Sequence, residues 1–263
     1  MIERTEQTMV STARKRIELI FNLSYLVSLW GLVVAMRRRR DRVPVEQRPE
    51  AERLREAFTL LAVGDTGHLA LRSVSLARGE GRGFIRYRGQ RASLIGLGEM
   101  ATSITITLFY VLTLDAWRLR FRKSWDRFTG SLLGLSGLRL LLLAMPFNRW
   151  DRDETPPGWG VVRNLPLLSV GAGEMVMMRR EADRAGDRTF RSLADAMAAS
   201  FACYTPVILF ARRIPQVGLL MIPKTVAYLY MAARVYFGMY RGTPQNTRSD
   251  QPAAAAVPVA AEV

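Results

Sequence analysis

Apolar runs of roughly 18–22 residues, separated by short arginine-rich stretches, are the feature that most constrains how this chain can fold. The hydrocarbon core of a bilayer is about 30 Å thick and needs about 20 consecutive apolar residues in a helix, while charged residues collect at its two surfaces. A soluble helical protein instead distributes its charges along amphipathic helices. The pattern therefore predicts that the 263-residue chain is an all-α, polytopic membrane protein.

Seven transmembrane helices follow from these apolar runs. They are expected over residues 17–36, 57–77, 92–114, 128–147, 162–178, 192–211 and 216–237. The fifth is the least regular, because Arg163, Asn164 and Pro166 stand at its start. An even number of spans, with the fifth lost, is the alternative topology. The expected fold class is a seven-transmembrane-helix bundle, with residues 17–240 as the membrane domain.

Three segments outside these helices differ in composition. Residues 1–16 are polar and precede the membrane domain. Residues 78–91 alternate glycine with arginine and are expected to form a turn-rich loop at the membrane surface. Residues 241–263 are rich in alanine and proline and are expected to be a disordered tail.

Arginine dominates the basic residues, and the positions of these residues predict the orientation. The chain has 38 Lys and Arg against 23 Asp and Glu, a net charge of +15. Basic residues are more frequent after the odd-numbered helices, so the positive-inside rule places the N-terminus outside and the C-terminus in the cytoplasm, with the protein in the inner (plasma) membrane. Because the clusters stand at helix ends, anionic lipid headgroups, and not nucleic acid, are their expected partners.

Cysteine and histidine are too scarce for several kinds of site. Cys203 is the only cysteine, which excludes an intrachain disulfide and a cysteine-based metal centre. His68 is the only histidine, which excludes a zinc site built from several histidines. The residues themselves therefore lead us to expect no metal and no other cofactor.

Charged and polar residues inside the predicted spans form the candidate site. The second helix carries Asp65, His68 and Arg72, whose spacing of three and four residues places them on one stripe. The remaining candidates are Glu99, Thr102, Arg139, Glu174, Lys224 and Tyr228. An ionisable residue at the centre of a membrane helix costs roughly 2.5–3.5 kcal/mol on insertion scales, so such residues serve a function or pair with one another.

Depth along the helices brings these charges into one band. At about 1.5 Å per residue, Glu99, Arg139 and Lys224 lie roughly 10–12 Å from the outer ends of their helices. Asp65 and Glu174 lie at about 18 Å. With Arg72, three cations face three anions, and we expect one connected polar site in the outer half of the bundle. Such charges either hold the helices in register as ion pairs or form a ligand, ion or catalytic site, and six of them on five helices favour a site.

Lys224 stands out in a chain that otherwise prefers arginine. A buried lysine can lose its proton and act as a base or as a Schiff-base nucleophile, whereas arginine stays charged. The alternative is a structural ion pair between Lys224 and Glu99 or between Lys224 and Asp65.

Three sequence blocks resemble segments of an uncharacterised bacterial family of multi-spanning membrane proteins. They are GDTGHLALR (residues 64–72), GLGEMATSITITLFYV (96–111) and MIPKTVAYLY (221–230). The blocks lie in the second, third and seventh predicted helices and contain most of the charges described above. The resemblance implies a bacterial membrane protein and brings no activity with it.

The chain is also similar to microbial rhodopsins in a few positions. Lys224 would be the retinal-binding lysine of the seventh helix, and Glu99 would be the counterion in the third. The run FACYTPVILF (201–210) resembles the aromatic motif of that family's sixth helix. Leu220 stands where the family has an aspartate, and the family's pocket tryptophans are absent. The resemblance implies retinal on Lys224 as the alternative to a protein without a cofactor.

Three functions are open at the level of the sequence. The first is a membrane protein that binds a small polar or amphiphilic ligand, or moves protons or ions, at the charged site. The second is an intramembrane lipid-modifying enzyme of the hydrolase type, in which Asp65, His68 and either Glu99 or Lys224 supply the acid–base groups. The third is a retinal-binding protein.

Overall fold

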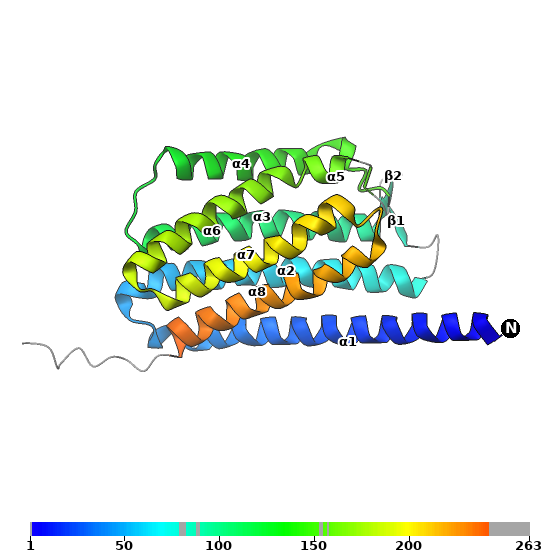
Figure 1. The fold of residues 1–263 in the computed structure, drawn as a ribbon, viewed down its shortest axis with the longest axis horizontal. Helices are drawn as coiled ribbons and strands as arrows, with labels where there is room; N and C mark the ends of the chain where they lie inside the picture. Colours follow the sequence, from blue (N-terminus) through cyan, green and yellow to red (C-terminus); the bar gives the residue numbers. More distant parts are fainter. Residues whose placement is uncertain (1, 79–82, 88–89, 153–154, 157, 242–263) are drawn as a thin grey trace, which may run out of the picture.

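The fold is a bundle of helices that run alongside one another (Figure 1). The computed structural model describes residues 2–78, 83–87, 90–152, 155–156 and 158–241. Seven α-helices in this part of the chain are longer than ten residues, namely α1 (Ile2–Arg38), α2 (Arg48–Arg78), α3 (Leu94–Arg120), α4 (Arg127–Ala144), α6 (Leu165–Ala185), α7 (Arg188–Phe210) and α8 (Met221–Val235). The all-α class is therefore confirmed.

Long helices that follow one another in the sequence are also neighbours in space. α2 packs against α3, α3 against α4, α4 against α6, α6 against α7, and α7 against α8. α1 contacts both α2 and α8, which closes the bundle. The connections at residues 121–126 and 186–187 are short, as is typical of neighbouring antiparallel helices.

The bundle has two chemically different ends. The hairpin end, on the right in Figure 1, carries the strands β1 (Phe84–Tyr87) and β2 (Gln90–Ser93), the single-turn helix α5 (Trp159–Val162) and residues 211–220. The arginine end, on the left, carries the connections at residues 39–47, 121–126 and 186–187 and the π-helix Tyr236–Tyr240.

The segment expected to be a loop at residues 78–91 is corrected by the structure. β1 and β2 pair as an antiparallel hairpin that begins within this segment and runs beyond it. Because β2 continues to Ser93, α3 begins at Leu94 and not at residue 92. The hydroxyl of Ser93 accepts a hydrogen bond from the backbone N–H of Gly96 at 3.1 Å, which satisfies a free donor of the first turn.

Two prolines lie at helix starts, and this shifts the fifth and seventh predicted helices. Pro166 stands in the first turn of α6, and Pro223 stands in the first turn of α8. At these positions the missing N–H of proline removes no intrahelical hydrogen bond. The residues before them form the separate turn α5 and the 3₁₀-helix Pro215–Leu220.

The two ends of the chain differ in how they relate to the bundle. The polar segment expected at residues 1–16 is helical from Ile2 and forms the first part of α1. α1 projects beyond the other helices at the hairpin end (Figure 1). The tail expected at residues 241–263 lies outside the described residues, apart from Arg241.

Four helical segments are long and apolar enough to cross a membrane by length and composition. They are Ile20–Arg38, Leu94–Arg120, Arg127–Ala144 and Arg188–Phe210. α2 and α6 carry charged residues along their length, and α8 has 15 residues before it continues as the π-helix Tyr236–Tyr240. The four apolar segments indicate a membrane protein.

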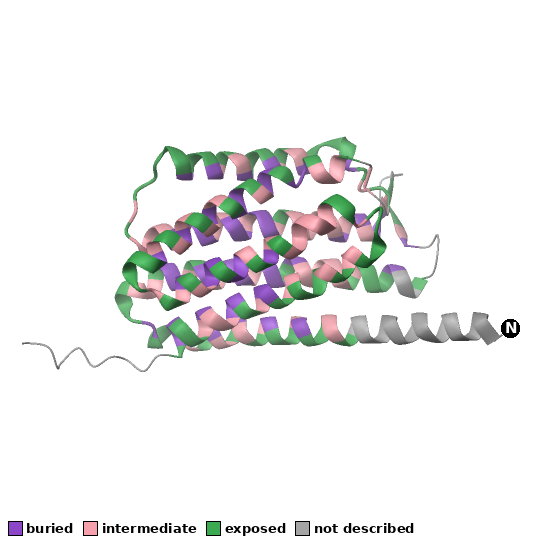
Figure 2. Ribbon diagram, in the orientation of Figure 1, coloured by how far each residue is buried: buried purple, intermediate pink, exposed green. Residues whose placement is uncertain are grey.

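α4 shows most clearly how polar and apolar side chains are distributed. Arg139 has an exposed fraction of 1%, while Leu138 and Leu141 are 45% and 62% exposed. Figure 2 shows the same division along α4, with its outward side exposed and the side that faces the bundle buried. A helix of a water-soluble protein turns its apolar stripe inward. The reversed arrangement fits a hydrocarbon surrounding, in which polar residues face the interior of the bundle.

α2 and α3 approach each other closely through glycines. A Cβ added at Gly64 would lie 1.8 Å from Thr105 Oγ1, and one added at Gly98 would lie 3.0 Å from the Cα of His68. Small residues at a helix interface allow two backbones to pack together inside a membrane. The close contact brings the polar residues of α2 and α3 within hydrogen-bonding reach of each other.

Gly64→Ala is expected to lower the free energy of unfolding by about 1–3 kcal/mol, because the new methyl group would overlap the side chain of Thr105. Gly67→Ala on the same helix is the matched control, because nothing lies within 4 Å of its added Cβ. Thermal unfolding of the purified protein in detergent, followed by tryptophan fluorescence, compares the two variants. Equal stability of both would contradict the close packing of α2 on α3.

Candidate functional site

Asp65 on α2 is held by hydroxyl groups from the two neighbouring helices. Tyr25 of α1 donates its hydroxyl to Asp65 Oδ2 at 2.6 Å, and Thr102 of α3 donates to Oδ1 at 3.1 Å. Both carboxylate oxygens therefore have a donor, and the three helices meet at this side chain. The predicted candidates Asp65 and Thr102 are thus in direct contact.

Glu99 on α3 pairs with an arginine that the sequence analysis did not place in the site. Arg163, which follows α5, lies with a guanidinium nitrogen 3.2 Å from Glu99 Oε2. Arg163 also donates to Asn148 Oδ1 at 3.3 Å and stacks over the ring of Trp150 at 4.6 Å. The Glu99 side chain keeps an exposed fraction of 35%, so this pair forms the accessible edge of the polar region near the hairpin end.

Arg139 on α4 has only neutral hydrogen-bond partners. Its Nη1 donates to Thr107 Oγ1 at 2.7 Å, and its Nη2 donates to Asn164 Oδ1 at 3.1 Å. The same Asn164 oxygen accepts the hydroxyl of Tyr204 of α7 at 3.3 Å. Within the described part of the chain, the Nε of Arg139 is buried and has no hydrogen-bond partner.

Lys224 on α8 lies against two tyrosine rings. Its Nζ is 4.5 Å from the centre of the Tyr204 ring and 5.4 Å from that of Tyr228. The hydroxyls of Tyr228 and Tyr110 are 2.8 Å apart, which connects Lys224 to α3. No carboxylate of the residues that the structure describes lies within 4 Å of Lys224 Nζ, so the predicted direct pairs with Glu99 or Asp65 are not formed.

Glu174 on α6 lies apart from the other charges. It is 1% exposed, and its Oε2 accepts a hydrogen bond from Thr113 of α3 at 2.7 Å. Its Oε1 is buried and lacks a hydrogen-bond partner in the described part of the chain. Thr113 lies six residues further along α3 than Thr107, which contacts Arg139, and one connected band that includes Glu174 stays a prediction.

The stripe predicted on α2 is divided between the interior and the surface. Asp65 points inward, as described above, whereas Arg72 is exposed near the hairpin end. His68 lies against the backbone of α3 at Gly98, and its Nδ1 is buried with no hydrogen-bond partner among the described residues. The helix periodicity thus placed Asp65 and His68 near the interior, and Arg72 is too close to the helix end to follow them.

The residues of the site surround Asn164 of α6. Arg139 and Tyr204 both bond to its side-chain oxygen, and Lys224 lies against Tyr204. We call Arg139, Asn164, Tyr204, Lys224 and Tyr228 the central cluster. Arg163 and Asn164 were seen in the sequence only as irregularities at a helix start. Their polarity beside Pro166, in an otherwise apolar run, was the signal that they belong to a site.

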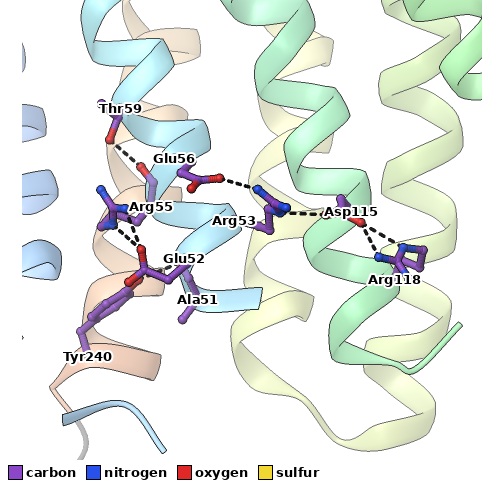
Figure 3. Close-up of polar contacts among 9 residues, drawn as sticks. All are labelled: Ala51, Glu52, Arg53, Arg55, Glu56, Thr59, Asp115, Arg118 and Tyr240. Atoms are coloured by element: carbon purple, nitrogen blue, oxygen red, sulfur yellow. Dashed lines mark hydrogen bonds and ion pairs between the residues drawn. The ribbon is translucent and has the colours of Figure 1, made fainter. Parts of the chain in front are cut away.

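The arginine end holds a second set of polar contacts, shown in Figure 3. Arg53 of α2 bonds to Asp115 of α3 at 2.9 Å, and Arg118 bonds to the same carboxylate at 2.8 Å. Beside them, Arg55 pairs with Glu52 at 2.6 Å (Figure 3). Several arginines that were expected to face lipid headgroups therefore pair with carboxylates of the chain itself.

Further ion pairs tie the other helices together at this end. Arg120 of α3 contacts Glu50 of α2 at 3.3 Å and Asp187 before α7 at 2.8 Å. Lys123 contacts Glu181 of α6 at 2.9 Å, and its ammonium group holds the pKa of that carboxyl below its usual range. Charges at the arginine end are thus directly paired, in contrast to those of the central cluster.

Comparisons with protein families, with curated proteins and with solved structures find no match to this chain. Among the described residues, no group of three or more His, Cys, Asp or Glu side chains is placed to hold a metal ion.

The pair of Lys123 and Glu181 is expected to make stability depend on pH. Because the folded pKa of Glu181 lies below the unfolded value of about 4.3, the contribution is present above that pH and is lost as the pH falls through the folded pKa. Lys123→Gln should lower the free energy of unfolding by less than about 1 kcal/mol at neutral pH, as is typical of a partly exposed pair. The difference from the wild type should vanish in acid.

Thermal unfolding at a series of pH values measures this difference. Glu181→Gln serves as the companion variant and should lose at least as much stability at neutral pH, because Glu181 also pairs with Arg184 at 2.9 Å. A difference between wild type and Lys123→Gln that grows as the pH falls would contradict the assignment.

Proposed function

We propose that the chain is an integral membrane protein whose seven long helices cross the bilayer, with a polar interior that binds a small ligand or conducts protons or ions. In this arrangement the hairpin end and the N-terminus lie outside, and the arginine end lies in the cytoplasm. The proposed membrane is the inner (plasma) membrane of a bacterium, in line with the family resemblance of α2, α3 and α8. The four apolar segments and the outward leucines of α4 support the membrane setting.

The three remaining helices are compatible with this topology. α8 and the π-helix that continues it form 20 consecutive helical residues from Met221 to Tyr240, a length that fits a hydrocarbon core of about 30 Å. α2 and α6 are more polar, but each contacts two or more other helices, and their charges Asp65 and Glu174 point into the bundle. Charged residues in membrane helices are tolerated when they face the interior.

One observation carries the functional part of the proposal: the buried and half-buried charges are not neutralised by one another. Within the described residues, Asp65, Arg139, Glu174 and Lys224 have no ion-pair partner within 4 Å. If the charges only fixed helix register, direct pairs such as those at the arginine end would be expected in their place. Unpaired charges inside a membrane protein are costly, so their retention favours interaction with a mobile ion or ligand.

The lipid-modifying enzyme is less well supported by the geometry. Both oxygens of Asp65 accept hydrogen bonds from Tyr25 and Thr102, and none of the described acids bonds to His68. A general base needs a partner within hydrogen-bond reach of the proton that it moves. Retinal on Lys224 would also need a counterion, and Glu99 is engaged by Arg163. We therefore prefer ligand binding or conduction.

Transport and binding by the purified protein test the proposal. Proteoliposomes should show flux of protons or of a small ion, or the protein should carry a small molecule detectable by mass spectrometry after denaturation. Lys224→Met and Asp65→Asn should each reduce the signal at least about ten-fold, because each removes a charge from the interior. Gly67→Ala, which touches no neighbour, is the control and should keep the signal.

The comparison is made with variants that remain monodisperse in detergent, so that a loss of flux or of the bound molecule cannot result from unfolding. A signal that survives both Lys224→Met and Asp65→Asn, or the lack of any signal from the wild-type protein, would contradict the proposal.

A further inference from the structure

Arg139 offers hydrogen-bond donors that the chain does not use. A guanidinium group has five N–H donors, and two of its nitrogens bond to Thr107 and Asn164. The Nε is buried without a partner among the residues described. An unsatisfied buried donor is costly, and more so on a charged group. The Nε–H of Arg139 is therefore a buried donor that no described residue satisfies.

Lys224 offers a second set of donors in the same region. Its ammonium group has three N–H donors and lies over the faces of Tyr204 and Tyr228, which attract a cation but accept no conventional hydrogen bond. Both Lys224 and Arg139 reach the same pair of residues, because Tyr204 bonds to the Asn164 oxygen that also binds Arg139. Each of the two cations thus contacts one member of the Asn164–Tyr204 pair.

The charges around this contact leave a positive excess. Arg139, Arg163 and Lys224 are cations, whereas Asp65 and Glu99 are the nearby anions. Glu99 is engaged by Arg163, and both oxygens of Asp65 accept hydroxyl donors. These five side chains carry one more positive than negative charge, because three cations stand against two anions. A singly charged anion would balance the group.

We infer that the central cluster binds a compact, singly charged anion between Arg139 and Lys224, with a carboxylate as the favoured form. This rests on the proposed function and names the class of ligand for the same site. The Nε edge of a guanidinium presents two parallel donors, the geometry that matches the two oxygens of a carboxylate. Lys224 supplies a second positive charge through its contact with Tyr204, which shares the Asn164 oxygen with Arg139.

Thermal unfolding of the purified protein with added anions tests this inference. Acetate and chloride are titrated at constant ionic strength against a bulky sulfonate salt, and methylammonium is the cation probe. Acetate should raise the Tm of the wild-type protein, since a ligand that binds only the folded state stabilises it by mass action. The acetate concentration needed for a given rise should increase at least about ten-fold in Lys224→Gln.

Two further variants make the outcome specific. Arg139→Lys keeps the positive charge but loses the paired N–H donors of the guanidinium group. It should therefore weaken the effect of acetate on the Tm more than that of chloride. Lys123→Gln removes a lysine that pairs with Glu181 far along the bundle, and it should leave the acetate response unchanged. A chloride response equal to that of acetate would still support an anion site and would assign it to halides as well.

The inference is overturned if neither anion raises the Tm, if methylammonium alone does so, or if the acetate response is the same in Lys224→Gln, Arg139→Lys and the wild type. If flux or a bound molecule depends on Lys224 but no anion raises the Tm, only the anion site is contradicted. If the wild-type protein shows neither flux or a bound molecule nor an anion response, the proposed function is contradicted as well.

Discussion

The burial of Arg139 within a helix whose outer side is leucine sets the conditions for the rest of the molecule. A guanidinium stays charged, so it cannot escape the cost of burial by losing its proton. It must be surrounded by polar groups, and these come from three helices through Thr107, Asn164 and Tyr204. The helices α3, α4, α6 and α7 are thereby required to present polar side chains to one point inside the bundle.

Close packing of α2 on α3 completes the interior on its other side. Gly64 and Gly98 allow the two backbones to approach, and Thr102 can then reach Asp65. Charged side chains have different partners at the arginine end and in the central cluster. At the arginine end they form direct ion pairs, which link α2, α3, α6 and α7, whereas in the central cluster they are held by hydroxyl, amide and aromatic groups. The first arrangement is suited to holding helices together, and the second leaves charge available.

Much of the fold could be predicted from hydrophobic periodicity, because apolar runs and arginine clusters mark helices and their ends. Pro166 was expected at a helix start and lies in the first turn of α6, whereas Pro223 fell inside the predicted range 216–237 and lies in the first turn of α8, where proline is also favoured. The hairpin at β1 and β2 was missed because glycine and arginine obscured its few strand-forming residues. Of the candidate residues, Arg139 and Tyr228 are buried, and Asp65, Thr102 and Lys224 are half-buried.

The pairing of the charges could not be predicted from depth alone. Rise per residue places a side chain along the helix axis, but the rotation of each helix decides which neighbour it meets. For this reason Glu99 pairs with Arg163, which was treated as part of a helix start, and Glu174 bonds to Thr113 away from the cations. The acidic partners at the arginine end were missed for the same reason, since Asp115 and Glu181 reach across to other helices.

Labelling of single cysteines from one side of the membrane tests the central claim, that a seven-span bundle encloses this polar interior. In a background with Cys203→Ser, the exposed residues Glu46→Cys and Ser124→Cys report on the arginine end, and Asp151→Cys and Arg213→Cys report on the hairpin end. We predict that a membrane-impermeant maleimide labels the hairpin-end cysteines in intact cells and labels the arginine-end cysteines only after permeabilisation. Labelling of cysteines from both ends in intact cells would contradict the account.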